Sequence, residues 1–155
     1  MDRFTAVIVA GVLALVVAGI AAALALRGRE TPPDLSTPGG VALAYVQALW
    51  REDGEQAWNL LATSTRDETD RERFLQTLSG PGSRRDGGAR LTVEGEQVRG
   101  EKATVELVWQ YPGSGGFFGG GPYSESSTVR LVREDGSWRI TDPGYRYSLP
   151  KKGRS

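Results

Sequence analysis

A run of 23 uncharged residues near the N-terminus, Phe4 to Leu26, constrains this chain more than any other feature. As a helix rising about 1.5 Å per residue it would measure roughly 34 Å, which exceeds the hydrocarbon thickness of a bilayer, about 30 Å. Backbone polar groups in hydrocarbon must bond to one another, so such a segment is helical. The sequence therefore predicts one transmembrane helix over 4–26, behind a short flank of residues 1–3.

The alternative is a secretory signal peptide that is removed, since Ala23–Leu24–Ala25 offers a small-residue cleavage pattern. Signal peptides have an apolar region of about 7–15 residues after a basic start. Here the apolar run is longer and Arg3 is the only base before it, so we favour an uncleaved anchor. The flanking charges do not set its orientation, because Arg3 on one side is opposed by Arg27 and Arg29 on the other.

Small residues recur along one side of this predicted helix. Ala10, Ala14, Ala18 and Ala22 follow one another at four-residue spacing, which aligns them on one face. Small side chains at that spacing let two membrane helices approach closely, so they are the self-association candidates for a homodimer. The alternative is that they reflect only the abundance of alanine in the segment.

The composition excludes several classes of chemistry. The chain has no cysteine and no histidine, which removes disulfides, thiolate metal sites, a lipidated cysteine and any Ser–His or Cys–His nucleophile pair. From residue 31 onward, 16 Lys and Arg oppose 17 Asp and Glu, so the soluble part does not have the basic surface of a nucleic-acid-binding protein. We expect no cofactor, no bound metal and no nucleic-acid partner.

Residues 27–36 predict a short linker, since two adjacent prolines favour extended chain. A helix is expected to begin at Pro38 behind the N-cap Thr37 and to stop at Asp53–Gly54. Two further helices are expected from their apolar residues: Ala57, Trp58, Leu60 and Leu61 in the second, and Phe74, Leu75 and Leu78 in the third, which Ser64 or Thr65 would cap.

After residue 89 apolar and polar residues alternate, which is typical of half-buried antiparallel strands. The alternating apolar residues form four groups: Leu91 and Val93; Ala103, Val105, Leu107 and Trp109; Val129 and Leu131; Trp138 and Ile140. Arg99–Gly100 and Asp135–Gly136 lie where tight hairpin turns are needed. Three helices before four strands predict an α+β domain, with the helices on one face of a curved antiparallel sheet. We place this domain at 37–142, followed by a basic C-terminal tail over 143–155.

Three parts of the chain resemble the nuclear transport factor two-like superfamily. They are Thr37–Pro38–Gly39–Gly40–Val41 leading into Tyr45–Val46–Gln47–Ala48–Leu49–Trp50, then Asp53–Gly54–Glu55–Gln56–Ala57 before Leu60–Leu61, and finally Asp135–Gly136–Ser137–Trp138–Arg139–Ile140, which is similar to that fold's last strand. The resemblance covers 37–142 and implies a cone in which helices pack into a bent sheet. Many bacterial members sit outside the cytoplasm behind one anchor, which implies an N-terminus inside and an extracytoplasmic domain here.

The same resemblance bears on activity, although a fold alone does not define one. Some members are scaffolds in secretion and conjugation machines, whereas ketosteroid isomerase-like and SnoaL-like enzymes place acids, histidines or tyrosines inside the cone. No carboxylate here aligns with those catalytic positions, so we assign no catalytic residue. We expect a non-catalytic binding or scaffold module of the cell envelope, whose partner is an envelope protein or a second copy. The alternative is a small apolar-ligand-binding domain or degenerate enzyme that uses the cone's interior.

Four aromatic residues are expected to line the cone: Tyr45, Trp58, Trp109 and Trp138. An apolar pocket with a few polar groups is the usual form of a small-molecule site, but large aromatics also dominate small cores, so both interpretations stay open. Glu94 and Glu96, by contrast, alternate onto one outward strand face. Solvated carboxylates are ordinary in such a place.

The segment from Pro112 to Pro122 is longer than a hairpin needs and contains six glycines. It also holds the adjacent Phe117 and Phe118, whose exposure to water costs free energy. We predict that these two rings contact the bilayer or a protein partner; the alternative is a loop whose aromatics fold back on the domain. Through its anchor, the chain has the lipid bilayer as its first expected partner.

Overall fold

The computed structural model describes residues 32–78, 88–113 and 121–153. The predicted anchor with its alanines at 10, 14, 18 and 22 lies outside these ranges, and so do Phe117 and Phe118. In the described part, no helix is long and apolar enough to cross a bilayer. The chain from Pro33 onward forms one compact unit.

Four α-helices occupy the first described range: α2 Pro38–Trp50, α3 Gly54–Asn59, α4 Thr63–Glu68 and α5 Arg71–Leu78. The predicted start of the first is confirmed, because the Thr37 hydroxyl accepts a hydrogen bond from the Gly40 amide at 3.0 Å and Pro38 lies in the first turn. Asp53 caps α3 in the same way through the Gln56 amide, also at 3.0 Å. Local side-chain chemistry thus sets both helix starts.

The predicted third helix is in fact two helices, α4 and α5. The caps predicted at Ser64 and Thr65 are wrong, because both residues lie inside α4, which begins after Ala62 without a side-chain cap. The chain then becomes extended at Thr69, whose backbone pairs with a segment near the C-terminus. Asp70 starts α5 by accepting a hydrogen bond from the Arg73 amide at 3.1 Å. A pairing with a distant segment therefore interrupts a continuous helical pattern.

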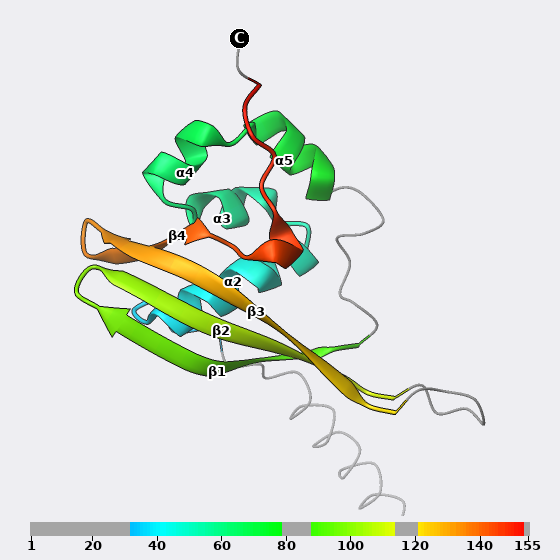
Figure 1. Cartoon of the computed structure of the whole chain (residues 1–155). Coiled ribbons are helices and arrows are strands. Elements are labelled where there is room, and N and C mark those ends of the chain that lie inside the picture. The colour runs from blue at the N-terminus through cyan, green and yellow to red at the C-terminus, as the bar shows by residue number, and fades with distance from the viewer. Residues whose placement is uncertain (1–31, 79–87, 114–120, 154–155) are drawn as a thin grey trace, which may run out of the picture. The chain divides into compact units, whose positions relative to one another are not determined.

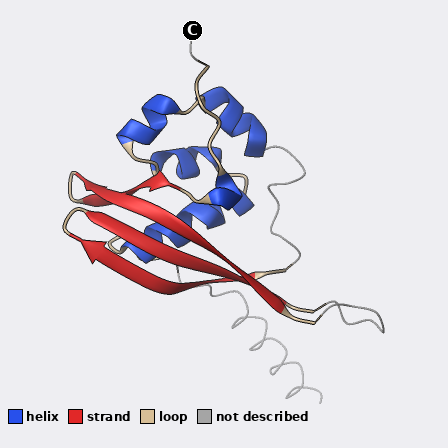
Figure 2. Cartoon of the chain, viewed as in Figure 1, coloured by secondary structure: helices blue, strands red, loops and turns tan. Residues whose placement is uncertain are grey.

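Four antiparallel strands, paired in chain order, make the sheet: β1 Arg90–Arg99, β2 Lys102–Tyr111, β3 Tyr123–Glu134 and β4 Ser137–Asp142. The turn predicted at Asp135–Gly136 is confirmed, since both residues have positive φ, as tight hairpins require. The turn predicted at Arg99–Gly100 lies one residue later, at Gly100–Glu101, because Arg99 still pairs with Lys102. The helices gather on one face of this twisted sheet (Figures 1 and 2). The predicted α+β class is confirmed.

The link between α3 and α4 covers the outer edge of β4. Leu60 and Leu61, predicted to be helical, follow the end of α3. The Ile140 amide donates to the Leu60 carbonyl at 2.9 Å, and the Ala62 amide donates to the Ile140 carbonyl at 2.8 Å. A strand edge leaves backbone groups unpaired unless another segment binds it, and here the non-helical link between α3 and α4 does so.

A β-bulge in β1 overturns the prediction that Glu94 and Glu96 share one outward face. The strand register shifts between Val93 and Gly95, so Glu94 is the extra residue and the alternation changes sides. Glu96 therefore faces the helices. Its carboxylate accepts a hydrogen bond from the Gly39 amide at 2.9 Å, which is favourable because the N-terminus of α2 carries partial positive charge.

Candidate binding site under the C-terminal strap

Residues 143–152, which we call the C-terminal strap, leave the end of β4 and run along the helical side of the sheet past α4 and α5 (Figure 1). The far end of the strap forms an antiparallel bridge between Lys151 and Thr69, flanked by two backbone hydrogen bonds of 2.9 Å. The segment predicted to be a basic tail outside the domain is therefore, over its described residues, part of the folded unit.

The strap begins with a one-turn helix, η1 (Tyr145–Tyr147), which brings Tyr147 between two of the predicted pocket residues. The ring centroid of Tyr147 lies 6.4 Å from that of Tyr45 on α2, nearly edge-on, and 6.2 Å from that of Trp109 on β2. Tyr45 and Trp109 are both fully buried. We call these three residues the aromatic chamber. Edge-on and tilted ring pairs at such distances are favourable beyond the area they bury.

Arg146, the neighbour of Tyr147, closes the side of the chamber. Its guanidinium forms an ion pair with Glu125 on β3, donates a hydrogen bond to the Tyr111 hydroxyl at 2.8 Å and lies 4.8 Å from the centre of the Trp109 ring. The Arg146 side chain is only 16% exposed. A guanidinium that meets a carboxylate, a hydroxyl and an aromatic face is held by charge, hydrogen bonding and cation–π attraction together.

The strap does not satisfy every polar atom that it covers. Within the described ranges, the buried side-chain atoms without a hydrogen-bond partner are the Tyr45 hydroxyl, the Trp109 indole nitrogen and the Ser127 hydroxyl. Tyr45 and Trp109 contact Tyr147, and a Cβ atom on Gly144 would collide with Ser127 Oγ. Burial, with a smaller contribution from the nearby Tyr147, raises the pKa of Tyr45 well above its usual value.

Two cavities flank the strap. A cavity of about 380 Å³ lies inward and is lined by Tyr45, Leu49, Phe74, Thr77, Leu78, Arg146, Tyr147, Ser148, Leu149 and Pro150. A larger one of about 620 Å³, which we call the polar groove, is lined by Ser64, Thr65, Glu68, Thr69, Thr141, Asp142, Pro143, Gly144, Tyr145, Ser148, Leu149 and Lys151. Ser148 and Leu149 line both, so the strap is the wall between the two cavities.

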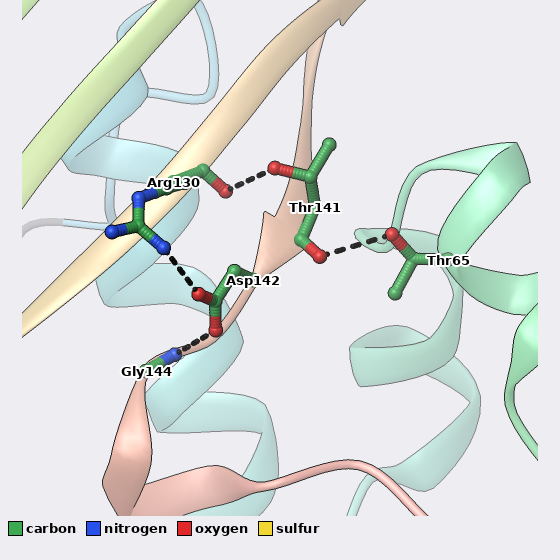
Figure 3. A network of polar contacts seen from close by, with 5 residues as sticks. All are labelled: Thr65, Arg130, Thr141, Asp142 and Gly144. Atoms are coloured by element: carbon green, nitrogen blue, oxygen red, sulfur yellow. Dashed lines mark hydrogen bonds and ion pairs between the residues drawn. The ribbon is translucent and has the colours of Figure 1, made fainter. Parts of the chain in front are cut away.

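Internal hydrogen bonds hold the wall of the polar groove in place (Figure 3). The Thr65 hydroxyl donates to the Thr141 carbonyl, and the Thr141 hydroxyl donates to the Arg130 carbonyl, both at 3.1 Å. Asp142 accepts from the Arg130 guanidinium at 2.8 Å and from the Gly144 amide at 2.9 Å. This network ties α4, β3, β4 and the start of the strap together, so the groove is preformed.

The other two predicted pocket residues lie elsewhere. Trp58 on α3 packs on Phe74 of α5, with ring centroids 5.5 Å apart, and the Arg71 guanidinium lies 5.9 Å from its ring. Trp138 on β4 is 2% exposed, and the Arg133 guanidinium lies 4.7 Å from its ring. Trp138 is thus a core side chain, whereas Trp58 is half-buried and packs against the edge of the core. The structure thus brings together only two members of the predicted set.

Sequence reasoning missed Arg146 and Tyr147 because the last strand seemed to end the domain. One signal was available: Gly144 to Pro150 contains two tyrosines, a leucine and a proline. A solvated tail rarely needs aromatic side chains, since their exposure costs free energy. The basic residues that follow, Lys151 and Lys152, are instead typical of a solvated tail.

No protein-family model matches the chain, and no curated protein does. Among solved structures, a SEC-C motif containing protein from Rhodopseudomonas palustris aligns with a TM-score of 0.50 over 77% of this chain and 83% of that one, at 17% identity. A protein described as an NTF2-like transpeptidase from Campylobacter jejuni aligns with a TM-score of 0.49 over 67% of this chain and 96% of its own, at 16% identity. At these identities the likeness concerns the fold alone.

Proposed function

We propose that the chain is a membrane-anchored, extracytoplasmic binding or scaffold module of the cell envelope, which acts without catalysis and binds a protein partner through the polar groove. The observation that carries this proposal is the occupied chamber: Tyr147 of the strap fills the space between Tyr45 and Trp109. The larger cavity instead opens beside the strap, with Glu68 and Lys151 exposed at its rim. The finer assignment to the nuclear transport factor two-like superfamily belongs to the same proposal.

The test is affinity purification of the full chain from native membranes with the groove charges exchanged. Glu68→Arg with Lys151→Glu should lower the yield of co-purified envelope protein at least tenfold, because rim charges select partners. The matched control is Glu106→Arg with Lys102→Glu, which makes the same charge changes at exposed positions of β2. Equal yields from both variants would contradict binding through the groove.

The anchor over 4–26 and the direction of insertion remain part of the proposal. Protease added to intact cells should digest the domain if the N-terminus is inside; full protection would place the domain in the cytoplasm. Replacing Ala14 and Ala18 by Leu tests self-association, because larger side chains would separate the helices. An unchanged yield of crosslinked dimer would mean that these alanines reflect only the composition of the segment.

A second membrane contact is proposed for Phe117 and Phe118. The strands that lead to them end in Tyr111 and Tyr123, whose rings stack with centroids 4.5 Å apart. Tyr123 is largely exposed, and tyrosine is enriched at membrane interfaces. The test is liposome flotation of the chain after its predicted anchor has been removed by cleavage. Phe117→Ser with Phe118→Ser should reduce binding to liposomes, whereas Tyr145→Ser should not. Unchanged binding would remove this contact.

A second candidate function is the binding of a small apolar ligand in the inward cavity. The lining of Leu49, Phe74 and Leu78 beside the unpartnered Tyr45 hydroxyl favours it, because such sites combine apolar walls with a few polar groups. Thr77→Phe would fill part of this cavity and should weaken binding of a hydrophobic fluorescent probe about tenfold. Gln97→Phe on exposed β1 is the control; equal probe binding by both would exclude the cavity.

A further inference from the structure

The strap is held by the three kinds of contact with which proteins bind short peptides. Charge fixes Arg146 against Glu125, and ring contacts fix Tyr147 against Tyr45 and Trp109. Backbone pairing then fixes the extended end of the strap. Peptide recognition commonly combines such backbone pairing with pockets for individual side chains.

The backbone pairing has a defined geometry. The Asp70 amide donates to the Pro150 carbonyl and the Lys152 amide donates to the Glu68 carbonyl, each at 2.9 Å. Thr69 and Lys151 are therefore a non-hydrogen-bonded antiparallel pair, whose Cα atoms lie about 4.5 Å apart. The link between α4 and α5 thus acts as a short strand edge that any extended segment could pair with.

The strap is an incomplete occupant of its own site. Tyr45, Trp109 and Ser127 each hold a buried polar atom without a partner, and each lies next to Tyr147 or Gly144 of the strap. A cavity of about 380 Å³ also adjoins the strap. Buried polar groups without partners cost free energy. A segment that filled the cavity or paired these atoms would bind the same surface more favourably than the strap does.

We infer that the surface beneath the strap is a peptide-binding site, and that residues 143–152 act as its built-in competitor. The partner is a peptide segment of another protein with an arginine followed by an aromatic residue and an extended stretch after them. The arginine would meet Glu125 and Tyr111, the aromatic ring would enter the chamber, and the extended stretch would pair at Thr69. This inference goes beyond the proposed groove binding, since it assigns a second surface and a sequence class of partner.

The competition sets the strength that such a peptide needs. A tethered segment acts at an effective concentration on the order of 1 mM. An external peptide with the same affinity as the strap must therefore be present above this concentration before it displaces the strap. Weakening the strap in the chain should therefore raise the apparent affinity for the peptide. Fixing the strap in place should abolish binding.

The first experiment uses the full chain in detergent and a fluorescent synthetic peptide that copies residues 142–153. A chain carrying Tyr147→Ala should bind this peptide at least tenfold more tightly than a chain carrying Tyr145→Ala. Tyr145 is the matched control because it lies in the same strap but is 70% exposed. A peptide with alanine at both the Arg146 and Tyr147 positions should not bind. Equal binding by the two chains would overturn the inference.

The second experiment keeps Tyr147 and locks the strap. Because the chain has no cysteine, Thr69→Cys with Lys151→Cys introduces a single pair, at a spacing that a disulfide can bridge. The reduced variant should bind the peptide with an apparent dissociation constant of about 1 mM. The oxidised variant should not bind it. Binding by both forms, or by neither, would overturn the inference. Disulfides between two chains would show that the site binds the strap of a second copy, which would overturn the inference that its partner is another protein. Partner capture through the polar groove is measured separately, on the chain without these substitutions and on its Glu68 and Lys151 charge variant, so the two proposals fail separately.

Discussion

Trp109 and Trp138 are both fully buried, and each has an arginine over its ring, with Arg146 at 4.8 Å from the first and Arg133 at 4.7 Å from the second. Arg133 and Trp138 are cross-strand partners in one hairpin, so their contact is local in sequence. Arg146 reaches Trp109 from the strap and is held by Glu125. One end of the core is thus completed by adjacent strands, and the other by a segment that returns after the sheet is finished.

The two ends also differ in how well their polar atoms are paired. The indole nitrogen of Trp109 is buried without a partner, as are the Tyr45 and Ser127 atoms near it. At the Trp138 end, no described side-chain atom is buried in this way. The strap end therefore depends on a remote segment and contains three buried polar atoms without a protein partner, each of which costs free energy.

The largest effect should come from the ring that fills the chamber. Tyr147→Ala should lower the free energy of unfolding by about 3 kcal/mol, because it leaves a cavity between two buried rings. Tyr145→Ala, in the same strap but exposed, removes one hydrogen bond to the Ser126 carbonyl and should cost at most about 1 kcal/mol. Urea unfolding followed by tryptophan fluorescence measures both. Similar losses would mean that the chamber is not the point at which the strap stabilises the domain.

The start of the strap should be the next most sensitive position. Gly144 has φ 84° and ψ 173°, a region nearly restricted to glycine, and an added Cβ would lie 2.7 Å from the Thr128 carbonyl oxygen. Gly144→Ala should cost about 2 kcal/mol. Gly136→Ala has positive φ but open space around it, so about 1 kcal/mol is expected. Equal losses in thermal unfolding would show that the close approach to β3 contributes nothing.

The pH dependence should also separate the two ends. Burial raises the pKa of Tyr45, because the folded chain disfavours the charged phenolate. Below the unfolded pKa, about 10, ionisation of this group therefore takes no stability from the fold. Above that pKa the unfolded chain loses the Tyr45 proton while the folded chain keeps it, so stability should fall by about 1.4 kcal/mol per pH unit. Tyr45→Phe should remove this part of the slope in unfolding curves recorded from pH 9 to 11; an unchanged slope would contradict it.

Below pH 9, Tyr45→Phe should stabilise the protein by about 1 kcal/mol, because it deletes a buried hydroxyl that has no partner. Tyr111→Phe should do the opposite by a similar amount, since its hydroxyl accepts a hydrogen bond from Arg146 at 2.8 Å. The sign of each change in the unfolding midpoint is the measurement. Destabilisation by both substitutions would mean that the chamber is better paired than its described contacts indicate.

The smallest effects concern the ion pairs. Glu125→Gln should lower the free energy of unfolding by about 1 kcal/mol, because the Arg146 side chain that it leaves unpaired is mostly buried. Asp142→Asn, which weakens the exposed pair with Arg130, should lower it by only about 0.3 kcal/mol. Repeating both at about 1 M salt should reduce the second more than the first, since screening acts mainly on exposed charges. A larger effect of salt on Glu125→Gln than on Asp142→Asn would contradict the burial of Arg146.

The sequence predicted the fold where the signals are local. The cap at Thr37 and the turn at Asp135–Gly136 each depend on neighbouring residues, and both are confirmed. The stop predicted at Asp53–Gly54 is slightly late, since α2 ends at Trp50 and Gly54 begins α3. The prediction failed where a distant segment decides the conformation. Thr69 is extended because the strap pairs with it, and no nearby residue announces that pairing.

The candidate site shows the same division. Tyr45 and Trp109 could be predicted, because helical and strand periods place apolar residues on the inner side. Their common neighbour Tyr147 could not, since the contact depends on the path of the chain after β4. The two remaining aromatics, Trp58 and Trp138, satisfied the same periodic rule but meet other partners. Periodicity indicates which side chains are buried, not which of them share one cavity.

The bulge in β1 has a consequence for insertions and deletions. Glu94 is the extra residue of that strand, and it turns Glu96 toward the Gly39 amide at the start of α2. Removing Glu94 would make the pairing regular and leave Glu96 where it is. Removing Gln97 would shift Val98 to the opposite face of the sheet. These two single-residue deletions, three positions apart, should thus differ in outcome. Deletion of Glu94 should be tolerated as a shortened strand, whereas deletion of Gln97 should disturb the sheet because the residues after it change faces.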